Sequence, residues 1–391
     1  MSHTIRIPYS RQEISEEEIK EVVRVLRSEY LTQGPEVLAF EQALCAACSV
    51  PYLVAVSNGT AALHLACQAM GIGPQSRVWT SPITFVASAN CALYLGATID
   101  FVDVEGNTGN MCVLALEEKL ILAEKRNVLP QLVIPVHFSG RVCDMERIAG
   151  LSQRYGFSVL EDACHALGAE YSGGDPVGSG RWSRATVFSF HPVKSITTGE
   201  GGAIATRDEA LAKKIAMLRT HGITKDKESL YKKDFPEWYY EEQVLGFNYR
   251  MNDLQAALGR SQLQRLPQFI SRRRELAQRY DKVLEKVPVV RPTYDPCSAW
   301  HIYVTQITGS EKRAGNKRDQ VYSQLRENGI GAQVHYYPVH LQPLFAGFGF
   351  LPGEFPVAEQ YSAQALSLPL YPSLSEKDQD FVVRSLAEAC S

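Results

Sequence analysis

The sequence predicts an α/β protein, in which a large domain built on a mostly parallel sheet flanked by helices precedes a smaller α/β domain. With 391 residues, the chain is longer than one hydrophobic core usually supports, so two domains are expected. Short apolar runs alternate with segments of helical periodicity through the first half of the chain, as in consecutive βαβ units. The pattern changes near Val289. We therefore assign 1–269 to an N-terminal arm and the large domain, and 270–391 to the small domain.

The expected strands of the large domain are short runs rich in β-branched and aromatic residues, which favour an extended backbone. They are Tyr52–Val56, Val78–Ser81, Thr98–Val102, Leu132–Val136, Ser158–Leu160, Ala185–Phe190 and Gly201–Thr206. Because helices separate most of these strands, right-handed crossovers and a largely parallel sheet are expected. The last two strands are joined by a short turn and should form a hairpin.

The expected helices carry apolar residues at intervals of three and four. Glu16–Ser28 places Ile19, Val22, Val23 and Leu26 on one stripe, and Pro35 suits the first turn of the next helix. The large-domain helices are Glu16–Ser28, Pro35–Cys48, Ala61–Met70, Phe85–Leu95, Leu114–Glu124, Met145–Tyr155 and Asp208–Arg219, with one or two more over 253–283. In the small domain we expect strands at His301–Ile307 and Gly331–His335, and helices at Gln320–Asn328 and Ala358–Ala365.

The composition excludes several classes of function. Lys and Arg number 40 against 43 Asp and Glu, a formal net charge of −3, which leaves no basic footprint for nucleic acid or an anionic membrane. No apolar run approaches the roughly 20 residues of a membrane span, and the N-terminus lacks a signal-peptide core. Nine cysteines, an odd number, fit reduced thiols in a cytoplasm.

Two further patterns are read as structural. Cys45-Ala-Ala-Cys48 has redox-motif spacing but falls inside an expected helix, where packing is favoured over a redox role. The nine histidines include no pair at tight ligand spacing, since His335 and His340 straddle a turn at Pro338. No metal site is therefore expected.

One lysine stands out in the turn between the last two strands of the large domain. Lys194 lies close to Pro192, Ser195 and Thr197, between an apolar strand and a glycine-rich one. Burial in this setting disfavours the ammonium form, so the pKa of Lys194 should fall toward neutrality, as an amine requires to form a Schiff base. A solvated lysine beside a turn is the simpler alternative.

Polar segments follow the carboxyl ends of other expected strands, where ligands bind in parallel sheets. Ser57-Asn-Gly-Thr-Ala61 opens a helix whose free N–H groups could hold a phosphate, although a plain helix cap fits equally well. Asp162 could pair with a protonated ring nitrogen, and His165 could lie against the same ring. A turn-capping carboxylate and a core histidine are the alternatives.

Three single residues complete the set. Phe85 follows a strand and could stack on a flat ring or belong to the core. Ser189 could reach a phosphate, and Asn248 lies in a loop before a helix. A phosphate cradle, a ring stacker, a carboxylate for a pyridinium and a Schiff-base lysine are together what pyridoxal phosphate requires.

The motifs that carry these residues resemble those of the DegT-type nucleotide-sugar aminotransferases, which are fold type I enzymes containing pyridoxal phosphate. The resemblance covers nearly the whole chain. Within the family, the chain is most similar to the branch that aminates C4 in pseudaminic acid biosynthesis. The motifs are Ser57-Asn-Gly-Thr-Ala-Ala-Leu-His64, Thr84-Phe-Val-Ala-Ser-Ala-Asn90, Glu161-Asp-Ala-Cys-His165, Phe188-Ser-Phe-His-Pro-Val-Lys194 and Gly246-Phe-Asn-Tyr-Arg-Met251.

This resemblance implies roles for individual residues. Lys194 would form the Schiff base, Asp162 would pair with the ring nitrogen, and Phe85 and His165 would lie on or near the two ring faces. Phosphate would be held by the hydroxyl of Ser189 and the backbone of Gly59, Thr60 and Ala61, while Asn248 would reach across from a second subunit of a homodimer. The sugar nucleotide would contact Tyr9, Glu29, Tyr30, Leu31, Thr32, Gly59, Ser189, Asn248, Gln333, Val334, His335 and Tyr336.

The resemblance also implies the reaction. Catalysis by Lys194, Asp162 and His165 would move the amino group of L-glutamate, through a pyridoxamine phosphate stage, to C4 of a UDP-linked 4-keto-6-deoxy sugar. The expected substrate is UDP-2-acetamido-2,6-dideoxy-β-L-arabino-hexos-4-ulose. Relatives that dehydrate sugars replace the lysine with histidine, whereas this chain keeps Lys194. Open alternatives are another nucleotide 4-ketosugar, of perosamine or 4-amino-arabinose type, and a non-catalytic regulatory binder with the same fold.

Overall fold

A seven-stranded sheet lies at the centre of the larger part of the chain in a computed structural model that describes residues 4–309 and 316–391. Its strand order is β1-β7-β6-β5-β4-β2-β3. Only β7 runs antiparallel to its neighbours, β1 and β6. The strands are β1 (Tyr52–Val56), β2 (Arg77–Thr80), β3 (Thr98–Phe101), β4 (Leu132–Ile134), β5 (Ser158–Asp162), β6 (Ala185–Ser189) and β7 (Gly202–Thr206). The predicted parallel sheet and its closing hairpin are both confirmed.

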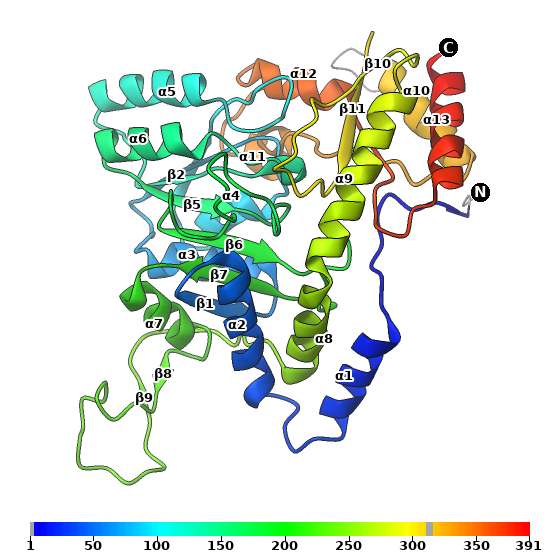
Figure 1. Cartoon of the computed structure of the whole chain (residues 1–391). Coiled ribbons are helices and arrows are strands. Elements are labelled where there is room, and N and C mark those ends of the chain that lie inside the picture. Colours follow the sequence, from blue (N-terminus) through cyan, green and yellow to red (C-terminus); the bar gives the residue numbers. More distant parts are fainter. Residues whose placement is uncertain (1–3, 310–315) are drawn as a thin grey trace.

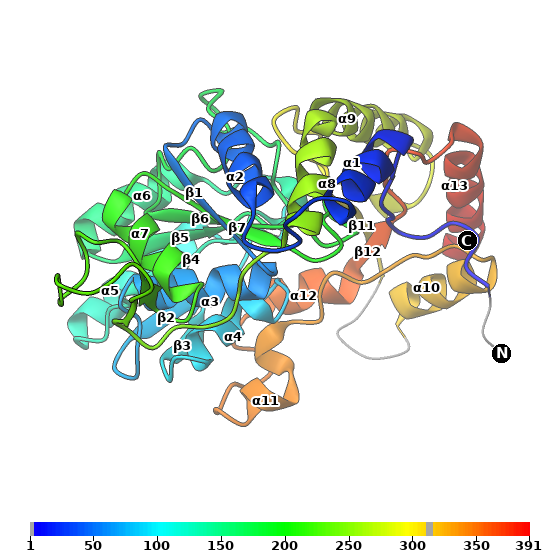
Figure 2. The same ribbon diagram turned by 90° about the horizontal axis from the view of Figure 1, so that it is seen from below.

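Helices cover both faces of this sheet, and each face has its own hydrophobic core. One core contains residues of α2 (Pro35–Cys48), α5 (Val113–Lys125), α6 (Met145–Tyr155) and α8 (Asp253–Gln264). The other contains residues of α3 (Gly59–Ala69), α4 (Ala87–Leu93) and α7 (Glu209–Leu218). In Figure 2, α2 and α6 lie above the sheet, and α3 and α4 lie below it. This three-layer arrangement is the α/β class that the sequence predicts.

A second, antiparallel sheet organises the C-terminal part. It consists of β10 (Val289–Val290), β11 (Tyr303–Ile307) and β12 (Ala365–Leu368). A third core joins it to α9 (Leu266–Val283), α10 (Lys317–Glu327) and α13 (Glu376–Cys390), at the right of Figure 1. The short α11 (Pro343–Ala346) and α12 (Pro356–Gln364) precede β12.

The C-terminal part is also where the sequence prediction differs from the structure. The strand expected at Gly331–His335 is wrong, because this segment forms only an isolated bridge from Gln333 to Ser367. β12 and α13 had no counterpart in the prediction. The boundary at 269/270 falls within α9, which continues through it as one helix, and the boundary itself stays a prediction.

Two peripheral segments matter for the site. The N-terminal arm crosses to the small domain, where Ile7 enters the third core, and then leads into α1 (Glu16–Leu26). A long excursion between β8 (Ile223–Thr224) and β9 (Glu241–Glu242) projects from the body at the bottom of Figure 1. Within 4–309 and 316–391, no helix is long and apolar enough to span a membrane, and no His, Cys, Asp or Glu side chains cluster as a metal site.

The cysteines fit the structural interpretation of the Cys45 and Cys48 pair. All nine cysteines are free thiols. Cys48 lies in the core on α2, and burial raises its pKa to about 12, which suits packing rather than thiolate chemistry.

Candidate active site

A cavity of about 970 Å³ opens where the carboxyl ends of five strands of the large sheet meet. The segments that follow β1, β2, β4, β5 and β6 all line it, as expected for ligands of a parallel α/β sheet. The segment 333–337 and Tyr9 of the N-terminal arm line the same cavity. Most of the residues that the sequence singles out are therefore brought together, from six separate parts of the chain.

The N-terminus of α3 forms one end of this cavity. Asn58 caps the helix, and its side chain accepts the N–H of Ala61 at 2.8 Å. The predicted phosphate contact from the Ala61 amide is thus already used within the helix cap. The amides of Gly59 and Thr60 still lack partners within the helix and point where its dipole favours an anion.

Ser189 stands directly against this helix end. A Cβ on Gly59 would lie 3.0 Å from the Ser189 Cβ and 3.2 Å from its Oγ, so glycine permits the close approach. Gly202 likewise permits a close approach to the segment before α3, because a Cβ at position 202 would lie 2.5 Å from the Asn58 carbonyl oxygen. A helix N-terminus and a hydroxyl placed this closely can both donate to one phosphate.

Lys194 enters the cavity from the turn between β6 and β7. Its N–H donates to the His191 carbonyl at 2.8 Å, and Ser10 of the arm donates to the Val193 carbonyl at 3.1 Å. Burial lowers the pKa of Lys194 from its ordinary value of 10.5, and the nearby negative charge of Asp162 opposes this effect. The direction agrees with the sequence prediction of an amine with increased free-base character.

Asp162, the last residue of β5, points into the same cavity. Its Oδ2 accepts from the Ser88 hydroxyl at 2.6 Å, and its Oδ1 accepts from the Cys164 amide at 3.1 Å. The Ser88 hydroxyl lies 2.7 Å from that of Thr84. These contacts orient the carboxylate without an arginine or lysine at salt-bridge distance in the described part of the chain, so its charge stays available to a ligand.

Glu161, next to Asp162, occupies the opposite face of β5 and is fully buried. It accepts from His137 Nε2 at 2.7 Å, from the Tyr171 hydroxyl at 2.7 Å, and from Ser183 and Thr186. Although burial alone would raise its pKa, these donors, above all His137, lower it. Glu161 therefore stays ionised and holds together the segments that follow β4 and precede β6.

His165 lies deeper in the site, beside Tyr336. The Tyr336 hydroxyl is 3.3 Å from His165 Nε2, and the two rings are nearly parallel with centroids 6.3 Å apart. Burial and the positive charge of Lys194 lower the pKa of His165 well below 6.5, so the imidazole is neutral. Phe85 also lines the cavity, but its side chain is 59% exposed in the single chain, so it is not a core residue.

The sequence-selected residues fall into two groups. The larger group lines the cavity: Tyr9, Gly59, Thr60, Ala61, Phe85, Asp162, His165, Ser189, Lys194, Gln333, Val334, His335 and Tyr336. The smaller group does not line it and is exposed: Glu29, Tyr30, Leu31, Thr32 and Asn248. The roles of both groups stay predictions.

Sequence reasoning missed the residues that support Asp162. Ser88 lies in the quoted motif that begins at Thr84, three residues after Phe85, and this spacing could have placed it on the sheet-facing side of the helix. Glu161 appears in the motif without a role. Its partners His137, Tyr171 and Ser183 carry no sequence signal, because only the tertiary fold brings them to one carboxylate.

These features fit pyridoxal phosphate. Gly59 lets the first turn of α3 approach the Ser189 hydroxyl, so that the free amides of the helix and this hydroxyl face the same cavity, where they could bind one phosphate. Asp162 offers an unpaired carboxylate to a ring nitrogen, and Lys194 offers an amine with a lowered pKa. The donor set thus matches the three polar groups of the cofactor.

Comparison with known proteins agrees with this geometry. Residues 12–387 match the model of the DegT/DnrJ/EryC1/StrS aminotransferase family. The chain is 42% identical to the spore coat polysaccharide biosynthesis protein SpsC of Bacillus subtilis, over 98% of this chain and 96% of that protein.

Solved structures give the same result. Helicobacter pylori PseC, an aminotransferase involved in the biosynthesis of pseudoaminic acid, is similar with a TM-score of 0.88 and 32% identity, covering 98% of each chain. The putative sugar aminotransferase Spr1654 of Streptococcus pneumoniae in its pyridoxamine phosphate form matches with a TM-score of 0.88 and 29% identity, covering 98% of this chain and 97% of that one.

Proposed function

Because the chain belongs to the DegT/DnrJ/EryC1/StrS aminotransferase family, and is therefore a sugar aminotransferase that uses pyridoxal phosphate, we propose that it transfers the amino group of L-glutamate to C4 of a UDP-linked 4-keto-6-deoxy sugar. The acceptor we propose is UDP-2-acetamido-2,6-dideoxy-β-L-arabino-hexos-4-ulose, and the product belongs to pseudaminic acid biosynthesis. The observation that carries the proposal is the single cavity shared by Lys194, Asp162 and the 333–337 segment.

The residues that line the cavity have separate roles toward the cofactor. When bound, pyridoxal phosphate supplies a carbonyl that takes the nitrogen of the donor and a ring that withdraws electrons from the adjacent carbon. Gly59, Thr60 and Ser189 would hold the phosphate. Asp162, oriented by Ser88, would stabilise a proton on the ring nitrogen. Phe85 and His165 would help to keep the ring in place.

Lys194 moves the reacting proton. Its Nζ takes a proton from Cα of the donor in the first half of the reaction and returns a proton to C4 of the sugar in the second half. An amine with a lowered pKa is suited to both steps, because the neutral form that takes the proton is more populated than in a solvated lysine. The fixed turn from His191 to Lys194 keeps the amine directed into the cavity.

A second acceptor class stands as the alternative: another nucleotide 4-ketosugar, of perosamine or 4-amino-arabinose type. The relative SpsC, which is 42% identical to this chain, is named for spore coat polysaccharide biosynthesis and not for pseudaminic acid. The residues that would distinguish the sugars are Tyr9 and the 333–336 segment.

We also propose that the active enzyme is a cytoplasmic homodimer. The exposed residues Glu29, Tyr30, Leu31, Thr32 and Asn248 do not line the cavity of their own chain, as expected if they complete the site of a partner. Tyr30 and Leu31 are apolar side chains at this surface, which supports their burial by a second subunit. The nine free thiols support a reducing compartment.

A transfer assay tests the proposed acceptor. The holoenzyme is incubated with nitrogen-15-labelled L-glutamate and a panel of UDP-, GDP- and dTDP-linked 4-ketosugars, and mass spectrometry follows the label. We expect the label in the 4-amino product of the UDP-linked acetamido sugar. If only a GDP- or dTDP-linked sugar is labelled, the acceptor belongs to the alternative class and not to the pseudaminic acid pathway. If no sugar is labelled, the proposal is contradicted.

A further inference from the structure

His301 is a buried histidine that the proposed reaction does not use. Only 2% of its surface is exposed, and its ring centroid lies 4.3 Å from that of His165. The Nδ1 atoms of both rings are buried and have no hydrogen-bond partner among the described residues. Two imidazoles in contact, each with a buried Nδ1 that has no partner, are unusual, since buried polar groups are nearly always paired.

A contact between two turns brings the rings together. The His301 N–H donates to the Ser139 carbonyl at 2.9 Å, and the Ala299 N–H donates to the Gly140 carbonyl at 3.0 Å. Gly140 has a φ of +93°, and a Cβ there would lie 2.9 Å from both the His165 carbonyl oxygen and the Trp300 nitrogen. The close approach of His301 to His165 therefore requires glycine at 140.

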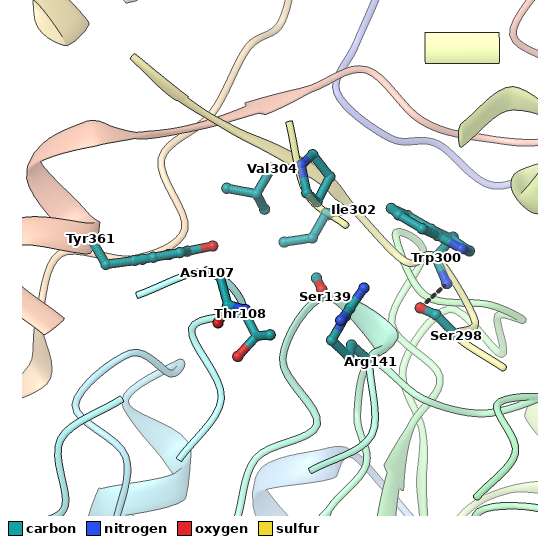
Figure 3. A pocket seen from close by; sticks show the side chains of 10 residues that line it. Asn107, Thr108, Ser139, Arg141, Ser298, Trp300, Ile302, Val304 and Tyr361 are labelled. Carbon is teal, nitrogen blue, oxygen red and sulfur yellow. Dashed lines mark hydrogen bonds between the residues drawn. The ribbon is translucent and has the colours of Figure 1, made fainter. Parts of the chain in front are cut away.

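The turn that presents His301 is itself constrained. Trp300 adopts a φ of +47°, a left-handed conformation that is rare for a large side chain. Figure 3 shows Trp300, with its backbone N–H bonded to the Ser298 hydroxyl, on the same side as Arg141 and across from Tyr361. These residues line a pocket of about 10 Å³. Beside this junction there is thus room for about one water.

Arg273 of α9 holds the same turn from the other side. Its Nη1 donates to the carbonyls of His301 at 3.0 Å and Leu370 at 2.9 Å, and it forms no ion pair with a carboxylate in the described part of the chain. Desolvation lowers the pKa of this guanidinium to about 10. Burying a cation without a carboxylate partner is costly, so the presence of Arg273 here indicates that the position of the turn at His301 matters.

Positive or neutral groups face His165 from every packed segment with a titratable side chain. They are Lys194 from the β6–β7 turn, His335 and Tyr336 from the 333–337 segment, and His301. Desolvation lowers the pKa of His335 to about 3, and burial lowers that of His301 well below 6.5. A proton on His165 Nδ1 would then find neither water nor an acceptor.

We propose that His301 is a positioning residue for His165: its ring packs against the His165 ring, excludes water from Nδ1, and keeps His165 a neutral imidazole beside Lys194. A charged His165 would oppose protonation of Lys194 during transfer, so this packing protects the proton-moving step. The inference rests on the proposed function only for the roles of His165 and Lys194.

The test follows the titration of His165 in the full-length holoenzyme. Histidine is labelled at Cε1 with carbon-13, the His165 signal is assigned from His165→Gln, and its chemical shift is recorded against pH. In His301→Ala, water reaches Nδ1, so His165 should become protonated at a clearly higher pH than in the wild type. In His301→Phe, which fills the same space, the titration should stay close to that of the wild type.

A matched control is His340→Ala, which removes another buried histidine that packs on Phe101 and Phe355 rather than on His165. It should leave the His165 titration unchanged. If His301→Ala does not fold, His301→Val opens a smaller gap and should shift the titration in the same direction. An unchanged titration in the folded small variants, or an equal shift in His301→Phe, would overturn the inference.

The readout separates this inference from the proposed function. Failure of the 4-ketosugar assay with a shifted His165 titration would overturn the substrate proposal and leave the positioning role standing. Successful transfer together with an unchanged His165 titration would overturn the positioning role of His301 and leave the substrate proposal standing.

Discussion

Ser88 illustrates how much a single hydroxyl contributes to the orientation of Asp162. Its Oγ donates to Asp162 at 2.6 Å in a buried setting, which makes this a hydrogen bond to a charged group. Such a bond is worth about 1.5–3 kcal/mol, and about 1.4 kcal/mol corresponds to a tenfold change in rate. Ser88→Ala should therefore lower kcat about ten- to a hundredfold with little change in cofactor affinity.

Two further variants give the kcat losses with which that of Ser88→Ala is compared. Asp162→Asn should cost more, about 10²–10³-fold, because it removes the carboxylate itself. Thr84→Val, which leaves the contact between Ser88 and Asp162 intact, should cost less than Ser88→Ala. A Ser88→Ala enzyme with wild-type kcat would show that the hydroxyl does not orient the carboxylate.

At the residue scale, the sequence predicted the groups that carry chemistry but not their supports. Lys194, Asp162 and Ser189 follow strand ends, and the carboxyl edge of a parallel sheet brings strand ends together whatever the details of packing. Ser88, His137 and Arg273 act through partners distant in sequence, at 74, 24 and 97 positions respectively. Neither periodicity nor spacing encodes such pairings.

At the scale of elements, the close contact between α3 and β6 is the feature most sensitive to change. A Cβ at position 59 would lie 3.0 Å from the Ser189 side chain, so Gly59→Ala must push the helix end away from the hydroxyl. We expect the affinity for pyridoxal phosphate to be at least tenfold weaker, because about one charge-assisted hydrogen bond to the phosphate is lost. Fluorescence titration of the cofactor-free chain with pyridoxal phosphate measures this affinity.

A matched glycine provides the control. Gly150 is exposed on α6, and a Cβ there would meet nothing within 4 Å. Gly150→Ala should leave cofactor affinity unchanged and slightly stabilise the helix. Equal affinities for Gly59→Ala and Gly150→Ala would argue against phosphate binding at the start of α3.

The elements of the large domain were more predictable than those of the small domain. α2, β1 and α6 begin and end where the sequence places them. Pro35 marks the first turn of α2, and Asp144 and Gly156 cap the two ends of α6. The segment Gly331–His335 has strand-like composition, but the Gly331 N–H donates to Ile7, and Gln333 and His335 face the cavity. Its backbone is thus shaped by the arm and the site. α13 does carry a signal in the sequence, because Ser375 caps the helix ahead of the buried Val382 and Leu386.

For the whole molecule, three buried histidines predict how stability depends on pH. Lowered pKa values for His165, His301 and His335 mean that these rings stay neutral in the fold, whereas unfolded histidine binds a proton near 6.5. The unfolded chain then binds more protons, so stability rises with pH and is lost below about pH 6.5. Each histidine contributes up to about 1.4 kcal/mol per pH unit.

Urea unfolding between about pH 5 and pH 7.5 measures this slope. His301→Phe removes one of the three protons and should flatten the slope in the acidic range. A stability that does not fall on acidification, or an unaltered slope in the variant, would contradict neutral burial of these rings.

The proposed sharing of sites between subunits predicts complementation. In a mixed dimer of Lys194→Ala and Asn248→Ala subunits, one site carries both changes and the other carries neither. Random mixing should therefore recover roughly one quarter of wild-type activity, well above either parent. Activity no greater than the mean of the two parents would show that Asn248 serves its own chain or no site.

The central claim is that the amine of Lys194 holds the cofactor at the carboxyl edge of the large sheet. Borohydride reduction of the holoenzyme fixes the bond between a protein amine and the cofactor carbonyl carbon, and mass spectrometry of the digest then locates it. We expect the cofactor mass on the peptide that contains Lys194, and none in Lys194→Ala. Attachment to another lysine, or a wild-type holoenzyme with no attachment at all, would contradict the account.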